Sequence, residues 1–145
     1  MIALIQRVTS ANVRVNGEEI ARIDNGLLAF IGVEKNDNEK QAKRLVERIV
    51  AYRVFEDADG KMNLGLKDVG GQLLLVSQFT LAADTKKGMR PSFSSAAPPE
   101  EGRKWFDYVV GLCRQEIDVV ATGQFGANMQ VGLINDGPVT FWLES

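Results

Sequence analysis

Three polar side chains, Ser77, Gln78 and Thr80, interrupt the apolar run LLLVSQFTL at residues 73–81. A strand end that presents hydroxyl, amide and main-chain N–H groups can bind a developing oxyanion. Ser and Thr hydroxyls also bond the nearby backbone where a strand leaves its sheet, so a local structural role stays open. Alternation along the strand places Gln78 and Thr80 on one face and Ser77 and Phe79 on the other.

A long loop without hydrophobic periodicity, residues 82–99, follows this segment. Compact domains rarely carry a loop of this length unless it has a task. Its cations Lys86, Lys87 and Arg90 suit contacts to phosphate or ribose, and the aromatic side chain of Phe79 or Phe93 can support a base. We therefore expect a nucleic-acid contact here, with a merely solvated loop as the alternative.

A third candidate is Gly137-Pro138, within the segment NDGPVT. We expect NDGP to form the turn between two strands, ANMQVGLI and VTFWLE. Only about 5–6% of X–Pro bonds in folded proteins are cis, so the dipeptide alone does not predict a cis bond. Glycine and proline do allow the main chain to approach a ligand closely.

The elements that must position these groups begin with β structure. The first third of the chain alternates apolar and polar residues, and Asn16-Gly17 is a strong hairpin signal. The apolar run at residues 27–33 is typical of a central strand. We expect an antiparallel meander here.

Two helices are expected after the meander. Asn36 and Glu39 have capping-box spacing, and Pro98-Pro99 suits the start of the second helix. In the first helix Ala42, Leu45, Val46, Ile49 and Arg53 recur at helical spacing, and the apolar stripe of the second is Trp105, Tyr108, Val109, Leu112 and Cys113. Residues 56–71 are interpreted as a Gly- and Asp-rich connection. The chain is therefore expected to form one α+β domain, residues 1–145, with a mainly antiparallel, barrel-like sheet and two main helices.

Composition narrows the classes of function. The chain has 17 basic and 19 acidic residues, so no strong overall field favours nucleic acid. It has no histidine and one cysteine, Cys113, which gives no disulfide and makes a transition-metal site improbable. The segment MIALIQRV is too short for a signal peptide, and no stretch approaches the roughly 20 apolar residues of a membrane span. We expect a cytoplasmic protein without metal, cofactor or membrane contact.

Taken together, these segments resemble the D-aminoacyl-tRNA deacylase family over nearly the whole chain. Its two signatures, SQxTL and NxGPxT, occur here as SQFTL and NDGPVT. The blocks GVEK, MNL, GMRPSF, TGQFGA and MQV lie around and between them. Asn128 occupies a position where the family often has an acidic residue, and this position lies outside both signatures.

The resemblance implies a homodimer that hydrolyses the ester joining a D-amino acid to the 3′ end of tRNA. In the family, the dipeptide matching Gly137-Pro138 is cis and enters the partner subunit's pocket, where its carbonyls exclude an L side chain. Glycine has no side chain to exclude, so glycyl-tRNA is expected as a second substrate. The other pocket residues that the resemblance implies are Ser77, Gln78, Phe79, Thr80, Phe125 and Met129.

The absence of histidine fits this chemistry. An aminoacyl ester is already activated, and the neighbouring ribose 2′-OH can assist its hydrolysis. The protein then needs to position the ester, hold a water and stabilise the oxyanion through main-chain N–H groups. Thr80 as a nucleophile is the rival mechanism, and it lacks a visible base. A non-catalytic RNA- or nucleotide-binding module, or a purely structural protein, is the alternative from another class.

Overall fold

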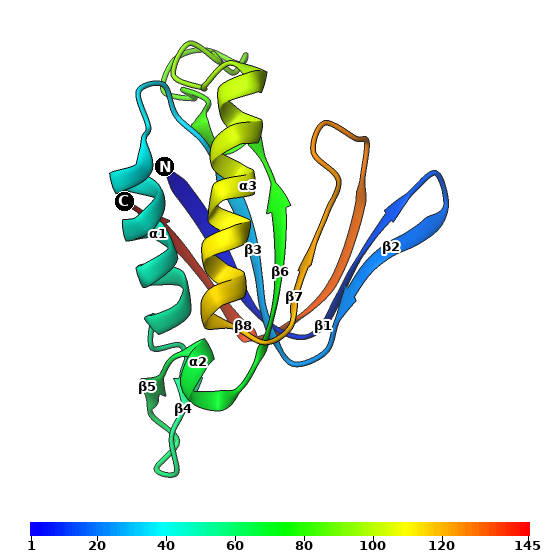
Figure 1. Cartoon of the computed structure of the whole chain (residues 1–145), viewed down its shortest axis with the longest axis vertical. Coiled ribbons are helices and arrows are strands. Elements are labelled where there is room, and N and C mark those ends of the chain that lie inside the picture. Colours follow the sequence, from blue (N-terminus) through cyan, green and yellow to red (C-terminus); the bar gives the residue numbers. More distant parts are fainter.

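A curved mixed sheet carries two long helices on one face in the computed structural model, which describes residues 1–145 (Figure 1). The strands are β1 (Ile2–Val15), β2 (Glu18–Ile23), β3 (Gly26–Gly32), β4 (Phe55–Glu56), β5 (Met62–Leu64), β6 (Gln72–Ser77), β7 (Val120–Thr122) and β8 (Gln130–Glu144). The helices are α1 (Glu39–Ala51), α2 (Leu66–Val69), α3 (Pro99–Glu116) and the 3-10 helix η1 (Phe79–Ala82). None of the helices has the length and apolar character needed to cross a membrane.

The long strand β1 organises the sheet. Strand β8 pairs with one of its edges, while β3 and β2 pair with successive halves of the other edge, all antiparallel. Strand β6 then adds parallel to β3, and β7 adds parallel to β6. Contacts of β2 with β6 and β7 bend the sheet toward a barrel. The predicted α+β domain with a mainly antiparallel, barrel-like sheet is confirmed, although two of the pairings are parallel.

The hairpin between β1 and β2 forms where the sequence predicts it. Asn16 has φ 51° and Gly17 has φ 79°. Positive φ at both central residues is what a type I′ turn requires, and its twist matches that of the flanking strands.

The sheet separates two apolar cores, because successive side chains of a strand point to opposite faces. Leu27 and Ala29 of β3 pack with Leu45 of α1 and Val109 of α3, while Leu28 packs in the second core. The predicted stripe of α3 does face the core: Cys113 is buried, and burial raises the pKa of its thiol to about 12. An uncharged, inaccessible thiol has no chemical role here.

The start of α1 corrects the predicted cap. The N-cap is Asn38, whose Oδ1 accepts from the N–H of Lys40 at 2.9 Å, and Gln41 Oε1 accepts from the N–H of Asn38 at 3.0 Å. Asn36 instead takes a left-handed conformation, with φ 68°, in the turn before the helix. Glu39, assigned to the capping box from its spacing, is the first helical residue.

Residues 56–71 are also more ordered than the predicted connection. They contain β5 and α2, and β4 begins just before them. The Asp57 carboxylate accepts from the N–H groups of Asp59 and Lys61, which closes the β4–β5 turn. Asp68 accepts from the N–H of Gly65 at 2.8 Å and so caps α2. Asp57 and Asp68, which in the sequence indicated only an irregular connection, therefore stabilise a turn and cap a helix.

Candidate functional site

A pocket of about 750 Å³ opens where the parallel strands β3 and β6 end, beside the first turn of α3. In open α/β sheets, ligands usually bind beyond the carboxyl ends of parallel strands, and the pocket has the same position relative to β3 and β6. The pocket is mostly apolar, and four chain segments form its walls. They contribute Ile31, Val33, Ser77, Gln78, Phe79, Phe93, Ala96, Ala97, Phe125 and Met129, among others.

The SQFTL segment changes conformation at the pocket. Strand β6 ends at Ser77, the N–H of Gln78 donates to the carbonyl of Ile31 at 2.8 Å, and η1 begins at Phe79. The predicted strand alternation through Thr80 is therefore wrong, because the 3-10 turn rotates the side chains that follow Ser77. Ser77, Gln78 and Phe79 line the pocket, whereas Thr80 is exposed and outside its lining.

Thr80 has no general base as a hydrogen-bond partner. Its hydroxyl oxygen accepts a hydrogen bond from Nε2 of Gln78, and an amide nitrogen cannot take a proton. The N–H groups of Phe79 and Thr80 open η1, and the first N–H groups of a helix have no acceptor within it. This turn therefore offers main-chain donors and no activated nucleophile.

Two aromatic side chains border the opening of the pocket. The rings of Phe79 and Phe93 lie 5.2 Å apart, centroid to centroid, at an angle of 49°. They remain 58% and 43% exposed, so a flat ring of a ligand can stack on them. Phe93 comes from the end of the long loop and Phe79 from η1, so their contact joins the two walls.

The opposite wall holds the predicted residues Phe125 and Met129. A Cβ atom at Gly102 would lie 3.5 Å from the Phe125 ring, and the Arg103 guanidinium lies 5.6 Å from the centre of that ring. At Gly123, a Cβ atom would approach the Met129 sulfur to 2.7 Å. The sequence reasoning missed these supporting residues, because nothing in the sequence pairs them with the rings that they hold.

The loop cations lie outside the pocket. Lys86, Lys87 and Arg90 are exposed, and none of them forms an ion pair. Two main-chain hydrogen bonds between Asp84 and Ser92, of 2.8 and 3.0 Å, close the loop that carries them. The cations are therefore free to contact an extended anionic ligand.

The NDGPVT segment is a bulge rather than the predicted turn. Strand β8 runs through it as one strand paired with β1. The register changes from Gln6 opposite Thr140 to Val8 opposite Asn135, so residues 136–139 are displaced from the ladder. The prediction failed because both flanking segments pair with the same side of β1, which local sequence does not reveal.

Side chains of the signature hold this bulge. Asn135 Oδ1 accepts from the N–H of Val139 at 3.0 Å, and Asn135 Nδ2 donates to Thr140 Oγ1 at 2.9 Å. Gly137 has φ 134°, a conformation that L residues rarely adopt, and its bond to Pro138 is cis. The Asn, Gly and Thr of the motif thus have structural reasons for their positions.

A buried arginine, missed by the sequence reasoning, also fixes the bulge. Arg7 is 8% exposed, and its Nε donates to the carbonyl of Asp136 at 3.1 Å. Its Nη1 donates to the carbonyl of Val54 at 2.7 Å, and the Asp136 carboxylate lies 3.5 Å from Nε. The available signal was a charged residue that faces the core within an apolar, alternating strand.

The bulge and the pocket lie at opposite ends of the sheet. Val8, opposite the bulge, pairs with Gly26, which pairs with Gln72, five residues before Ser77 on β6. With about 3.3 Å per residue and about 4.8 Å between strands, the bulge lies roughly 20 Å from Ser77. The structure therefore does not bring Gly137 and Pro138 to the pocket of their own chain.

No three His, Cys, Asp or Glu side chains gather in a way that could hold a metal ion. The chemical inventory of the pocket is an apolar cavity, two open aromatic rings, the Ser77 hydroxyl, the Gln78 and Asn128 amides, the Lys35 ammonium and main-chain N–H groups. Such a set can position a substrate and stabilise an oxyanion.

Comparison with known sequences gives consistent matches. The sequence model of the D-Tyr-tRNA(Tyr) deacylase family matches residues 4–144. The D-aminoacyl-tRNA deacylase of Vibrio cholerae serotype O1 (strain M66-2) is 60% identical over 145 residues, all of both chains. The D-aminoacyl-tRNA deacylase of Escherichia coli O81 is 59% identical over 144 residues, 99% of each chain.

Solved structures with the same fold include two that cover the whole domain. A structure titled c-Myc DNA Unwinding Element Binding Protein superposes with a TM-score of 0.96, at 39% identity, over 100% of this chain and 99% of that one. A probable eukaryotic D-amino acid tRNA deacylase superposes with a TM-score of 0.85 over 99% of this chain and 98% of that one. Its identity is 14%, so that likeness concerns the fold alone.

Proposed function

The chain belongs to the D-Tyr-tRNA(Tyr) deacylase family, and we propose that two copies of it together form each active site. It is a hydrolase that cleaves the ester bond of D-aminoacyl-tRNA. One observation carries the proposal of a shared site. Within one chain, most of the sheet lies between the pocket and the Gly137–Pro138 bulge. The bulge is held by several hydrogen bonds, yet the pocket of its own chain lies too far away for the bulge to contact a ligand there.

The exposed side of β8 supports a homodimer. Strand β8 pairs with β1 alone, so its other edge is open. Ile134 is 61% exposed and Trp142 49%, with Leu133 and Phe141 also exposed along the strand. An open edge strand with large apolar side chains favours association with another chain. In a two-fold dimer through β8, the same surface serves both copies, and the bulge of one copy can face the other.

In the proposed mechanism, the pocket binds the D-aminoacyl group and the 3′-terminal nucleoside stacks on Phe79 and Phe93. The N–H groups of Phe79 and Thr80 stabilise the oxyanion that forms when water attacks the ester carbonyl. The ribose 2′-OH of the substrate assists this attack. Thr80 does not attack, since the one side chain that its hydroxyl is hydrogen-bonded to is an amide. Leaving the activating group to the substrate explains how a chain without histidine can hydrolyse an ester.

Selectivity in this proposal comes from exclusion. Main-chain carbonyls of Gly137 and Pro138 of the partner subunit face the α-carbon of the substrate, so an L side chain meets them while a D side chain points away. Discrimination by a clash with the wrong ligand needs a rigid wall. Arg7 and Asn135 make the bulge rigid. Glycine has no side chain to exclude, so glycyl-tRNA is a second substrate.

The loop cations bind the tRNA in this proposal. Lys86, Lys87 and Arg90 contact phosphates near the 3′ end, which adds affinity without chemistry. A substrate that takes part in translation places the protein in the cytoplasm.

Release of the free amino acid tests the function. The purified chain should release D-tyrosine from D-tyrosyl-tRNA well above an enzyme-free control and leave L-tyrosyl-tRNA intact. Glycyl-tRNA should also be hydrolysed. Binding of the tRNA without hydrolysis would favour the non-catalytic RNA-binding alternative. If the chain neither binds the tRNA nor hydrolyses the ester, a purely structural role is the alternative that remains.

A further inference from the structure

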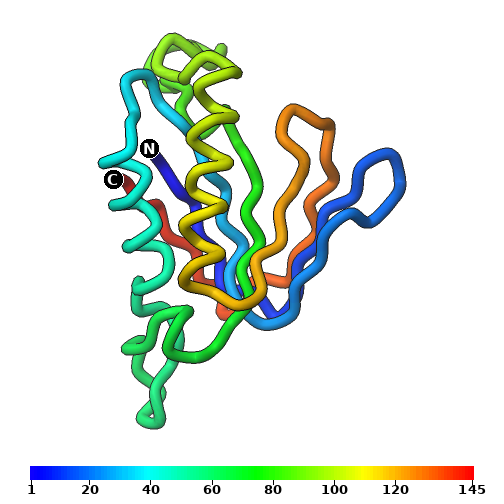
Figure 2. Tube along the Cα trace, viewed as in Figure 1, coloured from blue at the N-terminus to red at the C-terminus, as the bar shows by residue number.

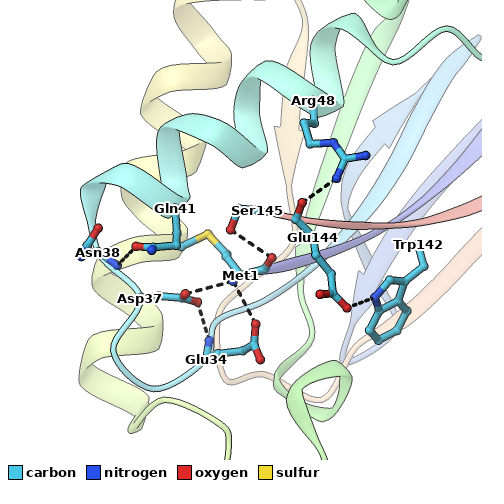
Figure 3. Close-up of polar contacts among 9 residues, drawn as sticks. All are labelled: Met1, Glu34, Asp37, Asn38, Gln41, Arg48, Trp142, Glu144 and Ser145. Carbon is cyan, nitrogen blue, oxygen red and sulfur yellow. Dashed lines mark hydrogen bonds and ion pairs between the residues drawn. The ribbon is translucent and has the colours of Figure 1, made fainter.

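The α-amine of Met1 is buried between two carboxylates (Figure 3). Met1 is 2% exposed, and its amine donates to Glu34 Oε1 and to Asp37 Oδ1, each at 3.0 Å. The Asp37 side chain is 7% exposed, and its second oxygen accepts from the N–H of Glu34 at 2.7 Å. One ammonium group thus joins both ends of the turn between β3 and α1.

The position of this amine is fixed by the C-terminal end of β8. The Met1 carbonyl accepts from the N–H of Ser145 at 3.0 Å and from its hydroxyl at 3.3 Å. Arg48 of α1 donates to the carbonyl of Glu144 at 2.6 Å. Figure 2 shows both chain ends beside α1. The amine therefore cannot shift outward without breaking these contacts as well.

The turn that the amine holds continues into the pocket wall. Glu34 forms a β-bridge with Ala96. The N–H of Lys35 donates to the carbonyl of Ser95, and the N–H of Ala97 donates to the carbonyl of Val33, each at 3.0 Å. Val33, Lys35, Ala96 and Ala97 all line the pocket. Residues 33–35 and 95–97 therefore connect the turn that the amine holds to the pocket, so a displacement of this turn would also displace the pocket wall.

A neutral or displaced amine would leave this turn without its counter-charge. A formyl or acetyl group converts the ammonium to an amide with one N–H, so two neighbouring carboxylates would face each other without a cation. A residue placed before Met1 would move the charge away from them. The cost falls mainly on the buried Asp37, whose charge would stay uncompensated, because the Glu34 side chain is 37% exposed and water can still solvate it.

We infer that the free α-amine of Met1 is a positioning group for the substrate pocket, and that acylation or extension of the amine loosens the wall formed by residues 33–38 and 95–97. The part of this inference that concerns turnover rests on the proposed function. The part that concerns the wall does not.

The experiment compares two proteins. One has a free Met1 amine, verified by intact mass, and the other carries one glycine before Met1. Both are also made in a Glu34→Gln/Asp37→Asn background. Glu47→Gln is the matched control, because its exposed carboxylate pairs with Arg44 of the same helix, at 3.4 Å, away from the turn. The readouts are amide hydrogen exchange and the kcat and KM for D-tyrosyl-tRNA.

We expect the added glycine to speed exchange in residues 33–38 and 95–97 by about tenfold or more, while β1 and β3 keep their protection. The KM should rise several-fold with kcat within about twofold, since the wall positions the substrate and performs no chemistry. In the Glu34→Gln/Asp37→Asn background the glycine should add little, because the interaction is already lost. Glu47→Gln should behave as the unmodified chain.

Unchanged exchange in residues 33–38 on adding glycine would overturn the inference. So would a loss of protection spread evenly over the sheet, or a glycine effect of the same size in both backgrounds. If the unmodified chain fails to hydrolyse D-tyrosyl-tRNA, the proposed function fails, while the exchange data still decide whether the amine holds the wall.

Discussion

The pocket at the ends of β3 and β6 and the Gly137–Pro138 bulge of β8 differ in how they are built. The pocket is assembled from four distant segments, is largely apolar and keeps Phe79 and Phe93 exposed. The bulge is one short segment, held by the buried Arg7 and by side chains of its own motif. An adaptable binding surface and a rigid wall are therefore separate structures in one chain.

Under the proposed function, this difference would let one enzyme be both tolerant of many amino acids and selective for chirality. The pocket lining is largely apolar, with Lys35 as its one charged side chain, so under the proposed function it can accept many amino acids mainly through apolar contact. Chirality, by contrast, is a matter of position, and a clash discriminates only if the wall cannot retreat. Each region can be perturbed without the other, and the following variants do so.

Gly137→Ala should have the largest effect. The φ of 134° disfavours an L residue, and the new Cβ atom would lie 2.6 Å from Val139 Cγ2 and 2.9 Å from its nitrogen. The displaced carbonyls should lower kcat/KM for D-tyrosyl-tRNA about 100-fold, the loss expected from misplacing a positioning group by about 1 Å. Gly60→Ala, at φ 77° with open space around it, is the control and should keep activity. Full activity of Gly137→Ala would show that the bulge has no part in the site.

Arg7→Met should loosen the same wall without changing its residues. The carbonyls of Asp136 and Val54 would lose their donor, which should lower the free energy of unfolding by at least about 2 kcal/mol. D-tyrosyl-tRNA turnover should fall about tenfold, and hydrolysis of L-tyrosyl-tRNA should become measurable. Arg53→Met, which removes an exposed arginine, is the control. Unchanged selectivity at a temperature where the variant is folded would contradict a rigid wall.

Replacing Lys86, Lys87 and Arg90 by alanine should affect affinity alone. The KM should rise several-fold with kcat within about twofold, and the slope of log KM against log salt should become shallower by up to about 2. The matched control replaces three exposed cations of α1, namely Lys40, Lys43 and Arg44. An equal change in both triple variants would mean that only net charge matters.

Thr80→Ala should have the smallest effect. Water attacks in the proposed mechanism, so kcat should stay within about threefold of the unmodified enzyme. Single-turnover hydrolysis of D-tyrosyl-tRNA measures it, with Thr85→Ala as the control. A loss of several orders of magnitude at unchanged tRNA affinity would favour Thr80 as the nucleophile and would contradict hydrolysis assisted by the substrate.

Local signals predicted local structure well. Asn16-Gly17 specified its hairpin because both residues accept positive φ, and the period of α3 identified its buried face through Val109 and Cys113. The polar end of β6 was also identified, because Ser77 and Gln78 interrupt an apolar run. Each of these depends on residues within a few positions of one another.

Features that depend on distant pairing were not predictable. The bulge looked like a turn because its identity depends on the register between β8 and β1. The role of Arg7 depends on carbonyls at Val54 and Asp136, which are remote in sequence. No glycine or proline marks the change from β6 to η1 after Ser77, where the N–H of Gln78 still bonds to the carbonyl of Ile31 in β3.

The central claim, that pocket and bulge meet only between subunits, is tested most directly by mixing two inactive variants. Gly137→Ala disables the bulge, and Ala127→Trp fills the pocket, since Ala127 lines it. Each homodimer is first shown to be inactive, and the two are then unfolded and refolded together. If the site is shared, half of the dimers are mixed and each mixed dimer has one intact site of two, so about one quarter of the unmodified activity should return. If no activity returns although mixed dimers are present, each chain forms its site alone and the account is wrong.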